Sequence, residues 1–120
     1  MEIVQEEIKF IRLGDTGKAK HSGIITVATF KGTHTVKYGV AFCSPKDHYD
    51  KTGGNELAVR RLSDHYADVE IHPKKMHHNT IGFTILADIY MSNEYPDWAE
   101  SIILVGMDEK LSNIVYEKYL

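Results

Sequence analysis

Residues 23–43 read GIITVATFKGTHTVKYGVAFC, and this stretch predicts a β-hairpin. The first half, Gly23 to Lys31, is rich in β-branched side chains, which suit the surface of a sheet. The second half, Thr33 to Cys43, alternates polar and apolar residues with the period of a strand. Between them Lys31-Gly32-Thr33 predicts a short turn, because glycine readily takes the positive φ of tight hairpin turns.

A third strand is expected before the hairpin, over residues 7–13, where Ile8 and Phe10 alternate with Ile11 and Leu13. The glycines of GDTG, residues 14–17, mark the turn that follows this strand.

The sequence after the hairpin carries helical signals. Ser44-Pro45-Lys46-Asp47 combines a capping residue with a proline at the first helical position, which predicts a single helical turn. Gly53-Gly54 is expected to end this turn, and Asn55 to cap a helix that reaches about Tyr66. Further on we expect a short strand over 68–72, a polar loop over 73–78, helices over 80–91 and 96–104, and a closing strand over 113–119. The apolar spacing of 80–91 also suits a strand.

Strands that cluster apart from helices are typical of the α+β class. We therefore expect an N-terminal antiparallel sheet with a hairpin, then two or three helices and a short C-terminal element. A chain of 120 residues has room for one such domain, residues 1–120.

Composition excludes several classes of protein. The net charge of -3 argues against binding a long nucleic acid, although a few focused cations suffice for a small anionic ligand. One cysteine permits no intrachain disulfide, which fits a reducing compartment. The start of the chain does not read as a signal peptide, and no apolar stretch is long enough to span a bilayer. We expect a cytoplasmic protein with no membrane contact and no cofactor.

The histidines do not predict a metal site. His72, His77 and His78 lie close in sequence, but no second cysteine and no HExxH motif accompany them. Solvated loop histidines are the favoured interpretation.

Nucleophilic and acid–base chemistry have weak candidates. Cys43 precedes a helical turn, a position that can activate a thiol, but a buried structural cysteine is favoured. Asp47, His48 and Asp50 could serve acid–base catalysis, but capping and surface roles are favoured, because helix capping already explains Asp47.

Ligand binding has candidates of a different kind. Backbone N–H groups after Gly53-Gly54, followed by Arg60 and Arg61, could hold an anion, although a linker and a solvated basic face are favoured. Phe83 fits a core position better than a stacking platform on these grounds alone. Asn93 suits either a reader of a polar base edge or a helix C-terminal cap.

A family resemblance rests on residues 37–47 (KYGVAFCSPKD), their continuation through 53–54 (GG) to 58–62 (AVRRL), and the spacing from Phe83 to Asn93. These features, within residues 23–95, resemble the first-described Thoeris anti-defence family. Its members are small phage proteins that form oligomers and trap cyclic ADP-ribose isomers made by bacterial TIR enzymes; some are implicated in trapping cyclic oligonucleotides. The resemblance implies that Phe83 stacks on the ligand and Asn93 hydrogen-bonds it. Arg60 and Arg61 are chosen as pyrophosphate contacts by their charge.

The expected function is sequestration, without catalysis, of a cyclic nucleotide-type immune signal, which would block bacterial anti-phage defence such as Thoeris or CBASS. The partners expected are a small anionic nucleotide and further copies of the chain, as a dimer or hexamer. Two other classes stay open. One is a small enzyme acting on a nucleotide or phosphoester through Asp47, His48 and Cys43 or through the loop histidines, and the other is a phage inhibitor that binds a host enzyme.

Overall fold

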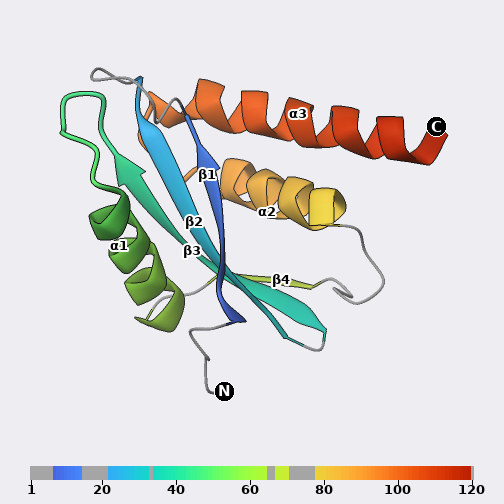
Figure 1. Cartoon of the computed structure of the whole chain (residues 1–120), viewed down its shortest axis with the longest axis horizontal. Coiled ribbons are helices and arrows are strands. Elements are labelled where there is room, and N and C mark those ends of the chain that lie inside the picture. The colour runs from blue at the N-terminus through green and yellow to red at the C-terminus, as the bar shows by residue number, and fades with distance from the viewer. Residues whose placement is uncertain (1–6, 15–21, 33, 65–66, 71–77, 120) are drawn as a thin grey trace.

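The computed structural model describes residues 7–14, 22–32, 34–64, 67–70 and 78–119 and shows an antiparallel sheet with helices on both faces (Figure 1). The elements in chain order are β1 (Lys9–Leu13), β2 (Ile24–Lys31), β3 (Thr35–Cys43), α1 (Lys51–Asp64), β4 (Ala67–Glu70), α2 (His78–Ser92) and α3 (Ala99–Tyr119). The sheet has the order β1-β2-β3-β4, and every neighbouring pair is antiparallel. The predicted α+β class, with an N-terminal antiparallel sheet, is confirmed.

The hairpin is confirmed, with β2 and β3 paired from Ile24 opposite Cys43 to Lys31 opposite Val36. The N–H of Gly32 donates to the carbonyl of Thr35 at 2.8 Å beside the turn, in which Thr33 lies outside the described residues. The strand expected over 68–72 is β4, of which residues 67–70 are described.

The alternation of side chains along β2 builds two cores. Ile25 and Val27 project to the face that α2 and α3 cover, whereas Ala28 and Phe30 project to the face that α1 covers (Figure 1). Residues 24–30 of this strand are all buried, which explains why its sequence is mostly apolar on both faces.

α1 lies directly on the backbone of β3 at Gly39. A Cβ at Gly39 would overlap the backbone nitrogen of Leu62 and the carbonyl oxygen of Ala58, so only glycine lets the helix approach this closely. The close approach brings Arg61, next to Leu62, to the edge of β3.

The expectation that Gly53-Gly54 ends a helical turn is wrong, because both glycines lie inside α1. The helix begins earlier, where Asp50 caps it: Oδ1 of Asp50 accepts from the N–H of Thr52 at 3.2 Å, and the carbonyl of Asp50 accepts from Gly54 at 2.9 Å. Asn55 therefore caps nothing, and its side chain instead accepts a hydrogen bond from Nη2 of Arg12.

The closing strand expected over 113–119 is also wrong, as is the end of the last helix near residue 104. Both stretches belong to α3, which runs from Ala99 to Tyr119. Ala99 and Ile103 are fully buried and anchor the first half of this helix in the core shared with α2. Once a helix is nucleated, each further residue adds a hydrogen bond at little entropic cost, so the weak local preference of residues 113–119 does not end it.

The ambiguity over residues 80–91 resolves as helix, since α2 spans His78–Ser92. Within the described ranges, no helix is long and apolar enough to cross a membrane.

Candidate functional site

A cavity of about 330 Å³ opens at the edge of β3, beside Ala67, the first residue of β4. β4 pairs only with Thr35–Tyr38, so the second half of β3 has no neighbouring strand on this side among the described residues. α1 reaches the cavity from one face of the sheet and the end of α2 from the other. The lining residues of this β3-edge cavity are Tyr38, Gly39, Val40, Phe42, Arg61, Ala67, Asp88, Ile89, Ser92 and Glu94.

Arg61 supplies the positive charge of the β3-edge cavity. Its Nη1 donates to the carbonyl of Val40 at 2.6 Å, which ties the exposed side chain to the strand edge. No carboxylate in the described ranges forms an ion pair with it. The guanidinium therefore has donors left for an anion, and a guanidinium binds carboxylates and phosphates through two parallel hydrogen bonds.

Tyr38 and Asp88 form a short hydrogen bond at the base of the cavity. The Tyr38 hydroxyl donates to Oδ2 of Asp88 at 2.5 Å, and the tyrosine is only 5% exposed. Burial, and then the Asp88 carboxylate, raise the pKa of Tyr38 far above its ordinary value, so the hydroxyl stays a donor. The stability gained from the neutral phenol is present below about pH 10 and is lost as the pH rises through the folded-state pKa.

The end of α2 forms a negatively charged wall. Asn93 takes a left-handed conformation with φ 57° and turns the chain, and the N–H of Glu94 then donates to Oγ of Ser92 at 3.2 Å. The last turn of α2 has no basic residue. A carboxylate near the negative end of the helix dipole is unfavourable by about 0.3–1 kcal/mol. The position of Asp88 and Glu94 therefore lowers the stability of the folded protein.

Phe42 gives the cavity an aromatic wall. Its ring meets Trp98 edge-to-face, with centroids 6.2 Å apart and an interplanar angle of 83°. This arrangement holds the Phe42 ring, because edge-to-face aromatic pairs are a preferred geometry.

Two of the four residues singled out from the sequence belong to this region. Arg61 lines the cavity, and Asn93 stands between two lining residues, Ser92 and Glu94. The positive φ of Asn93 confirms the alternative of a helix C-terminal cap. Its side chain is exposed, so capping leaves the amide accessible to a ligand.

The other two residues lie elsewhere. Arg60 lines a separate cavity of about 390 Å³ with Ile8, Phe10, Glu56 and Val59. Phe83 is half-buried near the start of α2 and does not line the β3-edge cavity. Asn93, just after α2, is ten positions along the chain from Phe83, a rise of about 15 Å. Within one chain, Phe83 and Asn93 therefore do not meet the same base.

The catalytic candidates do converge, in a cavity of about 250 Å³ beside the start of α1. It is lined by Cys43, Asp47, His48 and Asp50, together with Thr26, Ala41, Phe42, Tyr49, Gly53, Gly54 and Leu57. Burial, and then the charge of Asp47, raise the pKa of the Cys43 thiol. The thiol rather than the nucleophilic thiolate is favoured, which argues against cysteine catalysis.

Metal-ligating side chains do not gather in groups of three in the part of the chain that the structure describes. His72 and His77, considered as metal ligands from the sequence, lie outside the described residues.

The reactivity of Cys43 gives a first prediction. Its alkylation by iodoacetamide is expected to rise with pH through a midpoint above the ordinary cysteine pKa of about 8.5. Asp47→Asn should lower that midpoint, because it removes a negative charge that opposes the thiolate. The protein in denaturant is the control. A midpoint below 8.5 in the folded protein would mean an activated thiol and would contradict this assignment.

Sequence reasoning missed Asp88 and Glu94 and gave Tyr38 and Phe42 no role. A signal for Asp88 is present, since it is the one ionisable carboxylate in the apolar run ILADIY of residues 85–90. An acid in a half-buried stretch requires a partner, and here the partner is Tyr38.

Comparisons with known proteins give no further information on these cavities. A comparison with family models, curated proteins and solved structures finds no match to the chain.

Proposed function

We propose that this protein binds a small anionic, nucleotide-like ligand in the β3-edge cavity and sequesters it without turnover. The observation that carries the proposal is Arg61, a cation without a carboxylate partner among the described residues, at a cavity of suitable size. A volume of about 330 Å³ lies within the range of about 300–1,000 Å³ of small-molecule sites. Phe42 offers an apolar wall to a base.

The class of ligand comes from the resemblance to the Thoeris anti-defence family. It makes cyclic ADP-ribose isomers the first ligands to test, with cyclic oligonucleotides as a further class. Trapping such a signal in the host cytoplasm would block bacterial anti-phage defence. A pyrophosphate in these molecules would suit the fork of the Arg61 guanidinium.

The outer face of α3 supports a homo-oligomer, a dimer or hexamer. Leu104, Leu111 and Val115 are 41%, 46% and 48% exposed, and their spacing of seven and four residues places them on one side of the helix. Covering this stripe with a second copy would remove it from water. An oligomer would also allow Phe83 of one copy to approach the cavity of another. Light scattering on the purified protein measures its oligomeric state.

A second candidate function is favoured by the convergence of Cys43, Asp47 and His48 in one cavity. It is an enzyme acting on a nucleotide or phosphoester. The raised pKa of Cys43 counts against it, because the thiol form is a poor nucleophile. Chromatography of the ligand after incubation separates the two functions: a sponge returns it intact and an enzyme returns a product.

The test of the proposal combines ligand release with calorimetry. After incubation with bacterial lysate, the heated protein is expected to release an intact nucleotide. Arg61→Ala should weaken binding of a cyclic ADP-ribose isomer by about ten- to a hundredfold, the worth of a hydrogen bond to a charged group. Arg60→Ala is the matched control, since the neighbouring arginine lines another cavity.

Phe83→Ala in the same titration tests the role that the resemblance implies. Loss of base stacking would weaken binding by about ten- to a hundredfold with a near wild-type melting temperature. Release of no nucleotide, together with no binding of cyclic ADP-ribose isomers, would overturn the proposed function.

A further inference from the structure

We infer that the ligand presents a ribose diol to Asp88 and Glu94, and that Tyr38 positions Asp88 to receive it, an inference that rests on the proposed function. The β3-edge cavity has two differently charged sides. Arg61 on the α1 side suits a phosphate, but the carboxylates at the end of α2 would repel one. The part of the ligand that meets α2 must therefore donate hydrogen bonds.

A carboxylate accepts hydrogen bonds and donates none, so its natural ligand group is a hydroxyl or an ammonium. In nucleotide sites an Asp or Glu commonly accepts from the ribose hydroxyls. The sugar of a nucleotide lies between its base and its phosphate. In this cavity the carboxylates likewise accompany an aromatic wall, Phe42, and a cation, Arg61. The three parts of a ribonucleotide thus each find a matching group.

Tyr38 gives Asp88 a defined orientation. Its hydroxyl donates to Oδ2 of Asp88 at 2.5 Å from a position in the core, where the ring cannot move freely. No other side chain in the described ranges donates to Asp88, so Oδ1 keeps its acceptor capacity. Tyr38 is therefore a positioning residue, acting on the ligand through Asp88.

The backbone after α2 places the second carboxylate. The left-handed turn at Asn93, with the bond from the Glu94 N–H to Ser92 Oγ, returns Glu94 to the cavity that Asp88 lines from the helix. Two acceptors from different segments suit two adjacent hydroxyls.

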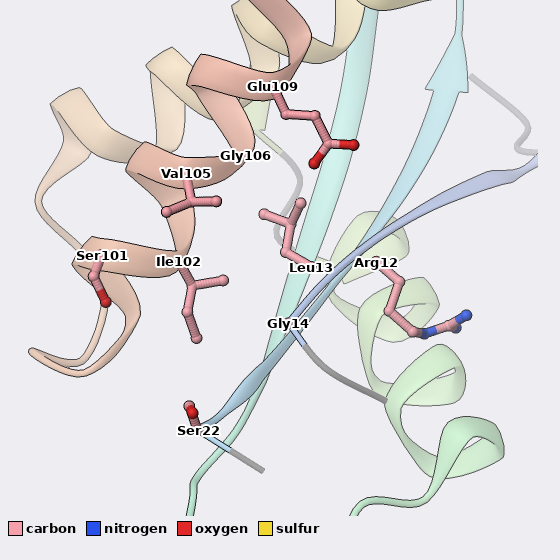
Figure 2. A pocket seen from close by; sticks show the side chains of 9 residues that line it. All are labelled: Arg12, Leu13, Gly14, Ser22, Ser101, Ile102, Val105, Gly106 and Glu109. Atoms are coloured by element: carbon pink, nitrogen blue, oxygen red, sulfur yellow. The ribbon is translucent and has the colours of Figure 1, made fainter. Parts of the chain in front are cut away.

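A separate cavity lies between β1 and α3 (Figure 2). It has about 420 Å³ and an apolar floor of Leu13, Ile102 and Val105. The Arg12 guanidinium points away from it toward α1, where Asn55 accepts its hydrogen bond, and Glu109 is the charged group directed at β1 (Figure 2). Because its polar side chains do not converge on one point, this cavity does not indicate a class of ligand.

The experiment compares ADP with 2′-deoxy-ADP by calorimetry on the whole chain. The wild type is expected to bind ADP about tenfold or more tightly than the deoxy analogue, because removing the hydroxyl leaves a carboxylate without its donor. Asp88→Asn should weaken ADP binding by about tenfold and bring the ratio of the two affinities toward one, with little change for 2′-deoxy-ADP. The amide keeps the shape of the side chain, and melting temperatures verify the fold.

Tyr38→Phe is the test of positioning. The substitution should lower the ratio of the affinities for ADP and 2′-deoxy-ADP, whereas loss of a merely structural role would weaken binding of both ligands equally. Arg60→Ala should leave both affinities and their ratio unchanged, because Arg60 lines a different cavity.

Each remaining result decides the question. Equal affinity of the wild type for ADP and 2′-deoxy-ADP overturns the inference and leaves the proposed function standing, as does binding of cyclic ADP-ribose isomers without binding of ADP. Binding of spermidine that Asp88→Asn abolishes would assign the carboxylates to a cation instead. Failure to bind any nucleotide overturns both proposals.

Discussion

Replacing Gly39 with valine is expected to prevent this chain from folding. A Cβ at this position would overlap backbone atoms of Leu62 and Ala58 and lie 2.8 Å from the carbonyl carbon of Arg61. Backbone of a packed helix cannot rotate away as a side chain can, so α1 would have to separate from β3. We expect the free energy of unfolding to fall by more than about 4 kcal/mol, which is at the upper end of the effects of single substitutions.

The matched control is Gly82→Ala, at another buried glycine. There the nearest atom to a new Cβ is Cε of Lys110 at 3.1 Å, the far part of a flexible side chain. Alanine also favours the helix over glycine by about 1 kcal/mol, so stability should stay within about 1 kcal/mol of wild type. Denaturant unfolding measures both variants. A Gly39→Val protein as stable as the control would show that α1 does not contact β3 in this way.

Ile103→Ala is the second substitution with a large expected effect, a fall of about 2–5 kcal/mol in the free energy of unfolding. Ile103 is fully buried where α3 packs on α2, and its truncation would leave a cavity in the larger core. Thermal unfolding followed by circular dichroism should show the loss as a lower melting temperature.

Val105→Ala provides the comparison within the same helix. Val105 is 66% exposed, so its truncation should change stability by no more than about 0.5 kcal/mol. If both variants lost the same stability, the first half of α3 would not be oriented as described. If neither did, the helix would not be part of the core.

The two glycines of α1 show why one local prediction was wrong. Two adjacent glycines signal a break, yet Gly53 and Gly54 continue α1. A Cβ on Gly53 would lie 3.0 Å from Oδ2 of Asp50, and one on Gly54 would lie 3.3 Å from Oγ1 of Thr26 on the sheet. The glycines serve close packing, and the favourable contacts of the rest of α1 outweigh their low helix propensity.

The site residues were only partly predictable for a similar reason. Arg61 could be proposed from its charge, because an arginine is always charged. The apolar surroundings of Asp88 in the sequence indicate only that it needs a partner, and neither Asp88 nor Glu94 carries a local signal for a site shared with Arg61. Their meeting with Arg61 depends on where β4 begins.

The sequence by itself determined the hairpin, the antiparallel start of the sheet and the α+β class, because strand alternation and turn residues act between near neighbours. The tertiary structure alone decided that Arg60 and Arg61 line different cavities and that Arg61 lines the same cavity as Asp88. These two side chains come from helices on opposite faces of the sheet (Figure 1). Among the described residues, β4 begins at Ala67, opposite Tyr38, so no strand pairs with the second half of β3 on this side. The two side chains meet there, and a pairing length of this kind is set by long-range packing.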